Sequence, residues 1–161
     1  MDGPGGLNYE LVKCNLDLDP TDGQFQLATT TSKFPEYPVA FHCDVSSVVD
    51  RIFTCNSMQV NAGGAMGTDG IFTVPLDGVY LFTFSGWTHS DDVDTIVNIR
   101  SDGLSIAYFR VRDDWKPDYG DEVLSGSAQA IIALKKDQKV DSYLSSGYIT
   151  GRFTGHLLYA T

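Results

Sequence analysis

Apolar and polar residues alternate with a period of two along much of the chain, most clearly between Gly70 and Phe84. Two short runs each place three apolar residues on one face: Phe72, Val74 and Leu76 in the first, and Tyr80, Phe82 and Phe84 in the second. Segment 75–78 between them predicts a turn, because proline cannot donate to a strand ladder and glycine accepts positive φ. The pattern therefore predicts two strands whose aromatic face lies at the centre of a core.

Other short runs rich in β-branched and aromatic residues predict further strands separated by turns. These runs are Val39–Cys43, Ile52–Val60, Thr95–Arg100, Leu104–Arg112, Ser127–Leu134, Lys139–Leu144 and Arg152–Tyr159. Segment 101–103 predicts a hairpin turn, and the polar segments 46–50 and 87–94 predict connections. With no amphipathic helical pattern and no internal repeat, nine or ten short strands indicate an all-β sandwich or barrel.

The domain organisation follows from where this pattern begins. Residues 1–38 are weakly patterned and are predicted to be an N-terminal extension, with a strong turn signal at 17–23 and a potential strand at Phe25–Thr31. Residues 39–161 are predicted to form one globular domain, since the chain of 161 residues has about the length of a single domain.

The composition narrows the classes of partner. The net charge is −10 and the sequence pI is about 4.4, which argues against nucleic acid and anionic membranes as partners. No apolar run approaches the roughly 20 residues that span a bilayer, so we expect no membrane insertion. The first residues lack the basic segment and apolar run of a signal peptide, which leaves open a protein that is not secreted and a chain that begins after cleavage.

Three cysteines, Cys14, Cys43 and Cys55, leave one thiol over after any single internal disulfide. In an oxidising compartment we expect one bridge and one free or intermolecular cysteine; in a reducing compartment all three can be buried thiols. The absence of a Cys-x-x-Cys pair and the dispersed histidines argue against structural zinc.

No catalytic motif is found, and no Gly-x-Ser-x-Gly sequence is present, so we do not expect an enzyme. Candidate ligand-binding residues lie in the predicted loops and at strand ends, and they are Arg110, Arg112, Trp115, Lys116, Tyr119 and Tyr148. The aromatic rings can stack on sugars, and the cationic groups can pair with a carboxylate or phosphate on a glycan. The alternative for Trp115 is a packing role at a subunit interface or over the end of the sandwich.

Acidic residues offer a second kind of candidate site. Asp91, Asp92 and Asp94 could hold calcium through carboxylate oxygens, as could a second acidic set in segment 113–121. Neither has the spacing of an EF-hand, and the alternative is solvated loop charge.

The residues also carry a family resemblance. Phe72, five further residues and then Gly78-x-Tyr80-x-Phe82-x-Phe84 resemble the signature of the complement C1q globular-head domain. The resemblance extends over residues 39–161 through Val39-Ala-Phe41, Asn61, Leu134, Val140 and Phe153-x-Gly155-x-Leu157-Leu158. It implies a ten-stranded jelly-roll sandwich, shared with tumour necrosis factor, that assembles as a homotrimer.

The sequence departs from this family at several positions. Cys55 stands where the family has Phe, Met66 stands where it has an aromatic residue, and Asp137-Gln138 replaces the Gly-Asp of a turn. Ala133 stands where calcium-binding members carry Asp, which puts an axial calcium site in doubt. In the implied fold the strands that hold Cys43 and Cys55 are neighbours, so we expect these two cysteines to form a disulfide and Cys14 to be left over.

The chain resembles stalkless C1q-domain proteins of invertebrates. This resemblance implies a secreted, homotrimeric pattern-recognition protein of innate immunity that binds microbial or host glycans, including lipopolysaccharide, without catalysis. No cofactor is required in this interpretation, although Ca²⁺ could bind. The alternatives are a receptor ligand of the tumour necrosis factor kind and an acidic, calcium-binding protein of a matrix or body fluid.

Overall fold

The computed structural model describes residues 11–18, 25–32, 38–89, 94–112 and 123–161, and it divides the chain into two compact units, 1–36 and 37–161. The first unit contains an antiparallel hairpin of β1 (Leu11–Leu18) and β2 (Phe25–Ser32), in register from the Leu11–Ser32 pair to the Leu18–Phe25 pair. Only β2 was predicted. The sequence of β1 nevertheless alternates from Val12 to Leu18, with Lys13, Asn15 and Asp17 as its polar positions.

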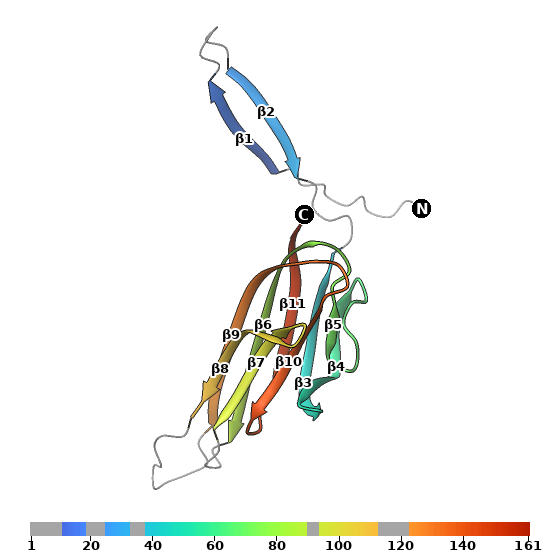
Figure 1. Cartoon of the computed structure of the whole chain (residues 1–161), viewed down its shortest axis with the longest axis vertical. Helices are drawn as coiled ribbons and strands as arrows, with labels where there is room; N and C mark the ends of the chain where they lie inside the picture. Colours follow the sequence, from blue (N-terminus) through green and yellow to red (C-terminus); the bar gives the residue numbers. More distant parts are fainter. Residues whose placement is uncertain (1–10, 19–24, 33–37, 90–93, 113–122) are drawn as a thin grey trace, which may run out of the picture. The chain divides into compact units, whose positions relative to one another are not determined.

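The second unit is built of strands, and its described residues contain no helix (Figure 1). Its strands are β3 (Ala40–Val49), β4 (Ile52–Ala62), β5 (Ile71–Thr73), β6 (Gly78–His89), β7 (Thr95–Ser101), β8 (Leu104–Val111), β9 (Val123–Leu134), β10 (Lys139–Ser146) and β11 (Thr150–Ala160). The all-β prediction is confirmed, but the described part of this unit has nine strands rather than ten. Segment 63–70 makes only an isolated bridge, between Met66 and Phe72, because three of its glycines have positive φ.

Several strands extend further than predicted. The polar segment 46–50 was predicted to be a connection, yet β3 continues to Val49 and pairs with β4 there. Likewise β6 runs through Trp87 to His89, and β9 begins at Val123 rather than Ser127. In β6 and β9 the strand continues although its outward residues are polar, because a half-exposed sheet needs apolar residues on only one face. In β3 residues 46–49 are all exposed, and this end of the strand is held by its pairing with β4.

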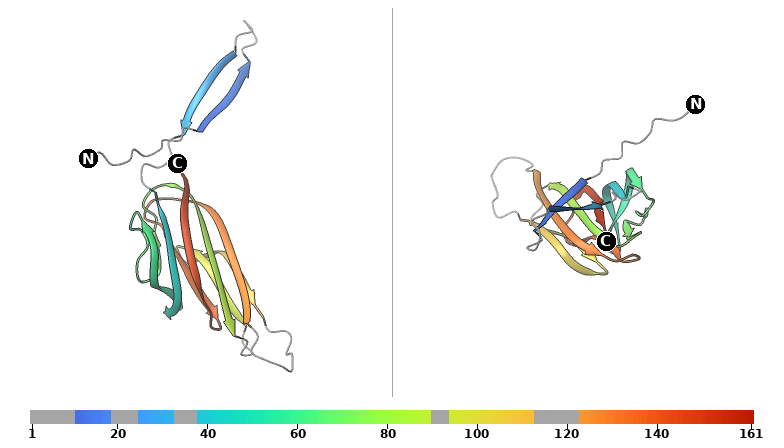
Figure 2. Two further views of the ribbon diagram at one scale, coloured as in Figure 1. Left: turned by 180° about the vertical axis from the view of Figure 1, so that it is seen from behind. Right: turned by 90° about the horizontal axis from the view of Figure 1, so that it is seen from above.

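The nine strands form two layers (Figures 1 and 2). One layer is a five-stranded sheet in the order β4-β3-β11-β6-β9, and the other is a four-stranded sheet in which β10 pairs with β5 and β7, and β7 with β8. A single residue pair, Tyr143 with Ile52, joins β10 to β4 between the layers. The antiparallel crossovers are those of a jelly roll.

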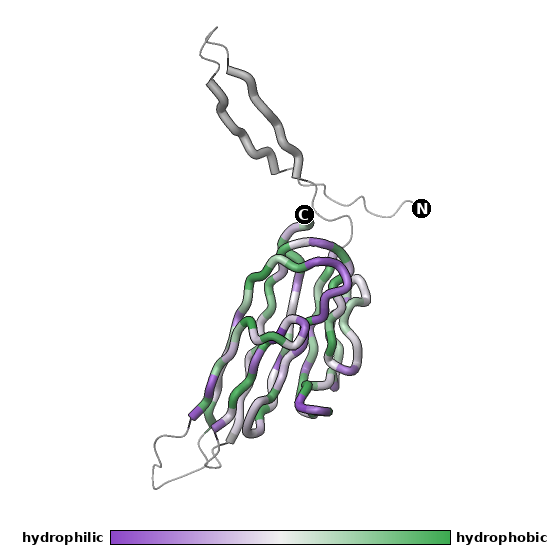
Figure 3. Tube along the Cα trace, viewed as in Figure 1, coloured by the Kyte–Doolittle hydropathy of each residue, from purple (hydrophilic) through white to green (hydrophobic). Residues whose placement is uncertain are grey.

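The core between the layers is aromatic. Tyr80, Phe82 and Phe84 are fully buried, which confirms the face predicted for this run. Their rings pack against aromatic residues of both sheets, such as Phe153 at 6.2 Å from Phe82 and Phe109 at 5.9 Å from Phe84 between centroids. Apolar and polar residues alternate along these strands in Figure 3. The packed rings fix the register of both sheets, because a slip of one residue would turn each ring outward.

A disulfide links the two strands at the edge of the five-stranded sheet. Cys43 of β3 and Cys55 of β4 are bonded, with their Cα atoms 5.5 Å apart. This is the pairing that the family resemblance implied. Cys43 is fully buried, so the bond ties the edge hairpin to the core.

Two aspartates anchor the turn between β9 and β10. Asp77 accepts hydrogen bonds from the Lys136 backbone N–H (2.7 Å) and the Lys135 ammonium (2.9 Å). Asp102 accepts from the Lys139 backbone N–H (2.9 Å) and the Gln138 amide (2.8 Å). These bonds to the charged form lower the pKa of both carboxyls below 3.8, with the backbone N–H as the largest cause in each. The same turn has its left-handed residue at a position occupied by Asp rather than Gly.

Candidate functional site

Four of the predicted site residues lie at one end of the sandwich, where β7 begins, β8 ends and β10 turns into β11. They are Asp94, Arg110, Arg112 and Tyr148. Asp94, just before β7, forms ion pairs with Arg110 and, at 3.6 Å, with Arg112, both near the end of β8. Tyr148, in the turn after β10, lies beside them, because the Thr95 hydroxyl donates a hydrogen bond to its carbonyl (3.3 Å). Tyr148 is 65% exposed, and its backbone is bonded to Thr95, which directly follows Asp94.

The other predicted site residues cannot be placed on this end. Trp115, Lys116, Tyr119, Asp91 and Asp92 lie outside the described residues. The described ones contain no group of three or more His, Cys, Asp or Glu side chains arranged for a metal. Asp94 itself is engaged by two arginines, so it would have to exchange these partners to serve as a calcium ligand.

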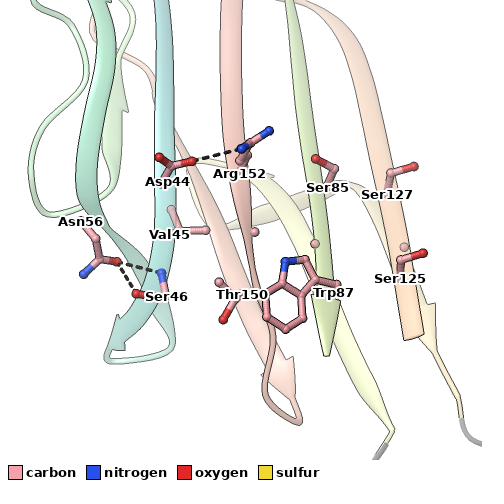
Figure 4. A pocket seen from close by; sticks show the side chains of 13 residues that line it. Asp44, Val45, Ser46, Asn56, Ser85, Trp87, Ser125, Ser127, Thr150 and Arg152 are labelled. Carbon is pink, nitrogen blue, oxygen red and sulfur yellow. Dashed lines mark hydrogen bonds and ion pairs between the residues drawn. The ribbon is translucent and has the colours of Figure 1, made fainter. Parts of the chain in front are cut away.

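The outer face of the five-stranded sheet contains a depression of about 870 Å³ (Figure 4). It is open to solvent and crosses all five strands of the sheet, and the residues that line it are Asp44, Val45, Ser46, Asn56, Ser85, Gly86, Trp87, Ser125, Gly126, Ser127, Thr150, Gly151 and Arg152. The large aromatic member is Trp87, whose side chain is 46% exposed. A row of hydroxyls from β6 and β9 lies next to it.

Charge in the depression is confined to one ion pair. The Arg152 Nε donates to Asp44 Oδ1 at 3.1 Å, and the Gln59 amide donates to the other oxygen of the same carboxylate at 3.3 Å. His42 lies 3.8 Å from Asp44. At the β4 side, the Asn56 amide oxygen accepts hydrogen bonds from the Ser46 backbone N–H (2.7 Å) and the Ser46 hydroxyl (3.2 Å). The depression can therefore bind another molecule by hydrogen bonds from its hydroxyls and by stacking on the indole, but not by a strong net charge.

Beyond the depression, the same outer face carries an apolar strip formed by Val79, Leu81, Ile131, Ala133 and Tyr159. Strand pairing places Leu81 opposite Ile131, and Val79 opposite both Ala133 and Tyr159. Ile131 is 68% exposed and Tyr159 is 56% exposed, although both are large apolar residues. This strip is therefore a patch of apolar surface that no described part of the second unit covers.

The five strands of this sheet are also depleted in acid. Together they contain one acidic residue, Asp44, of the 21 in the chain. Because Asp44 is paired with Arg152, the face carries little net charge while the protein as a whole carries −10. Depletion of charge with enrichment of large apolar side chains distinguishes the centre of a protein interface from ordinary surface.

The outer face of the four-stranded sheet is polar and ordered by side-chain contacts. Arg100 forms a two-pronged hydrogen bond with Asp141 (2.8 and 2.9 Å), and its guanidinium lies 3.8 Å from the centre of the Tyr143 ring. In the next cross-strand row, Asn98 pairs with Tyr108 on one side and with Tyr143 on the other. The Tyr108 side chain is 68% exposed.

Sequence reasoning missed both sheet faces. Trp87 was assigned to a loop, and Asn98 and Tyr108 were assigned to strands without a role. The signal for Trp87 was present, because it continues the outward positions of β6 after Leu81, Thr83 and Ser85. What the sequence could not show is which strands lie side by side, and so which outward residues share one surface.

Comparisons with known proteins support the fold. The structure is similar to that of the globular domain of zebrafish complement 1qA protein, with a TM-score of 0.57 and 21% sequence identity over 76% of this chain and 99% of that one. The second unit therefore has the fold of a C1q globular domain, which is the fold that the sequence resemblance predicted. Neither the models of protein families nor the curated proteins give a match to the sequence. In the described part of the chain, no helix is long and apolar enough to cross a membrane.

Proposed function

We propose that this protein is a secreted, homotrimeric recognition protein that binds microbial or host glycans, including lipopolysaccharide, without catalysis. The observation that carries the proposal is the division of the surface of its C1q-like domain. One sheet face carries an apolar strip and is nearly free of acid, whereas the other sheet face and the adjoining end present exposed tyrosines and paired charges. The first surface suits self-assembly and the second suits ligand binding.

Self-assembly is supported by the outer face of the five-stranded sheet. Ile131, Leu81 and their neighbours would lose contact with water in an oligomer, at a gain of roughly 25 cal/mol per Å² of apolar surface. Repulsion between chains that each carry −10 is smallest where acid is absent. We assign the depression to the same surface, since a neighbouring copy on the apolar strip would also approach Trp87 and its hydroxyls.

Glycan binding is supported by the chemistry of the opposite surfaces. Tyr148 is an exposed aromatic residue that can stack on a sugar, and Asp94 and Arg110 at the same end of the sandwich offer an acceptor and a donor for sugar hydroxyls. Such a shallow site binds weakly on its own. Three copies in one trimer would raise the overall affinity for a repetitive glycan surface by avidity.

Secretion is supported by the Cys43–Cys55 disulfide, because such bonds persist in oxidising compartments. A receptor ligand would use the same exposed surfaces, and it differs in requiring one protein partner. The calcium-binding alternative has less support in the described residues, since Asp94 is already held by two arginines.

The test is a glycan array that includes lipopolysaccharide, probed with protein whose oligomeric mass has first been measured. We expect binding above background, and a several-fold loss in Tyr148→Ala, because stacking on an aromatic ring contributes about 1 kcal/mol. Leu104→Ala is the matched control, since Leu104 is 75% exposed in the β7–β8 hairpin, away from Tyr148. Background binding by an intact trimer would reject the proposed function.

A further inference from the structure

We infer that the outer face of the four-stranded sheet binds an acidic oligosaccharide, with Arg51 holding its carboxylate. This inference rests on the proposed glycan function and names a ligand class and a site for it. The site consists of Arg51, Asn98, Ser105, Tyr108 and Ser145. The last four lie on the four-stranded sheet, and Arg51 lies in the turn between β3 and β4.

The first step is a polar network centred on Asn98. Its amide nitrogen donates to the Ser145 hydroxyl at 2.7 Å, and its amide oxygen accepts from the Ser105 hydroxyl at 2.9 Å. The Ser145 hydroxyl therefore keeps its own proton to donate, and the Ser105 oxygen keeps lone pairs to accept. A fixed donor and a fixed acceptor on either side of an amide match the hydroxyl groups of a sugar ring, which both donate and accept.

The second step is the aromatic ring beside this network. Tyr108 lies directly opposite Asn98 on the neighbouring strand, and its side chain is 68% exposed. An exposed tyrosine next to ordered hydroxyls provides the apolar face on which a sugar ring stacks. Tyr143, on the other side of Asn98, has the Arg100 guanidinium over its ring and so is less suited to stacking.

The third step is the positive charge of Arg51, which lies next to Ser145. The guanidinium of Arg51 donates to the Ser145 carbonyl at 3.1 Å, which places it next to the Asn98 network. No carboxylate among the described residues lies within ion-pair distance of Arg51, whereas Arg100 and Arg110 are both paired with aspartates. Arg51 is thus an exposed cation beside the Asn98 network, and it is complementary to a carboxylate.

The backbone at Arg51 supports a functional origin for this arrangement. Asp50 and Arg51 form the two-residue connection between β3 and β4, and both have positive φ, 51° and 67°. Glycine and asparagine are favoured in such turns, and a long side chain there is under strain. Strained residues often mark sites of function, and here the strained residue carries the guanidinium.

The distance across the site selects the length of the ligand. Tyr108, Asn98, Tyr143 and the β4 end next to Arg51 lie on four adjacent strands, about 4.8 Å apart from one strand to the next. One sugar cannot reach from Arg51 to Tyr108. The ligand is therefore an oligosaccharide whose acidic sugar lies at Arg51 and whose further rings cross Asn98 toward Tyr108.

The experiment measures binding of the 161-residue chain, in its trimeric form, to 3′-sialyllactose, trigalacturonic acid and lactose by calorimetry. We expect at least tenfold tighter binding to one or both acidic sugars than to lactose, and the two acidic probes show whether sialic or uronic acid is recognised. Arg51→Gly should abolish this preference without lowering the melting temperature, because glycine adopts positive φ without strain. Arg51→Lys should retain part of it, and Tyr108→Ala should weaken binding of all bound sugars.

The control is Lys136→Gln, which removes the same charge from an exposed position in the β9–β10 turn and should leave binding unchanged. Equal affinity for acidic and neutral sugars, or an Arg51→Gly variant that keeps the preference, would overturn the inference while the glycan function stands. An intact trimer that binds no sugar in this set or on the array would overturn both.

Discussion

Gly70 shows how one position can be restricted by its neighbours as well as by its backbone. Its φ is +81°, and an added Cβ would lie 1.7 Å from the Phe53 carbonyl oxygen, well inside any allowed contact. Gly103 has the same φ of +81° but nothing within 4 Å of an added Cβ. The two positions therefore separate steric exclusion from backbone conformation.

This difference predicts unequal effects of alanine. Gly103→Ala should cost about 1 kcal/mol of unfolding free energy, the usual penalty of left-handed backbone for a residue with a Cβ. Gly70→Ala should cost about 3 kcal/mol or more, because the β4 backbone must also move. Urea unfolding of both variants measures the difference, and equal losses would show that the contact with Phe53 can relax at no cost.

Turn residues with positive φ were only partly predictable from the sequence. Asp102-Gly103 was recognisable as a hairpin turn, and the structure has both at positive φ. Asp50-Arg51 makes an equivalent two-residue turn, but Arg has no preference for left-handed backbone, so the segment looked like a polar connection. The aromatic stripe of β6 was predictable because it depends only on alternation within one strand.

At the scale of elements, the β9–β10 turn depends on two carboxylates from other turns. Asp77 and Asp102 have pKa values lowered by hydrogen bonds from the turn backbone. A group whose pKa is lower in the folded state adds stability above its unfolded pKa, and this stability is lost as the pH falls through the folded value. Protonation of Asp77 and Asp102 should therefore contribute to the loss of folding stability below the usual carboxyl pKa of 3.8.

The prediction is that the double variant Asp77→Asn and Asp102→Asn loses less stability than the wild type as the pH falls below 3.8, while being less stable near neutrality. Thermal unfolding between pH 2 and pH 7 measures both effects. Asp50→Asn is the control, since Asp50 makes no ion pair with another described residue. If the double variant loses as much stability as the wild type between neutral and acidic pH, this account is contradicted.

The disulfide in the edge hairpin of β3 and β4 should contribute measurably to the stability of the fold. The Cys43–Cys55 bond closes a loop with a sequence separation of 12, for which chain entropy gives about 3 kcal/mol of stability. Reduction, or the Cys43→Ala and Cys55→Ala double variant, should lower the free energy of unfolding by roughly this amount. Cys14→Ser should not, and non-reducing peptide maps that link Cys14 to either partner would contradict the pairing.

At the scale of the whole molecule, the two outer sheet faces have opposite characters. The sandwich was predictable from the sequence, because alternation and turn chemistry occur along the chain. The surfaces were not, because Leu81 and Ile131, or Asn98 and Tyr108, become neighbours only through strand pairing. Of the predicted site residues, those in segments 90–93 and 113–122 lie outside the described structure.

The assembly surface makes a prediction of its own. The wild type should sediment with three times the chain mass of 17.6 kDa. Ile131→Arg should shift it toward monomer with the fold retained, since a buried unpaired charge at an interface costs several kcal/mol. Leu104→Arg places the same charge at an exposed position of the other sheet and should remain trimeric. A wild-type monomer, or an unaffected Ile131→Arg variant, would exclude this surface as the interface.

The measurement that tests the central claim most directly compares wild type and Ile131→Arg on one glycan found by the array, presented both as a free oligosaccharide and as a dense surface layer. We predict equal, weak affinity for the free sugar and much tighter surface binding by the wild type, because only the trimer gains avidity. Surface binding by the wild-type trimer that is no tighter than that of the Ile131→Arg variant would contradict the account of this protein as a trimeric glycan-recognition molecule.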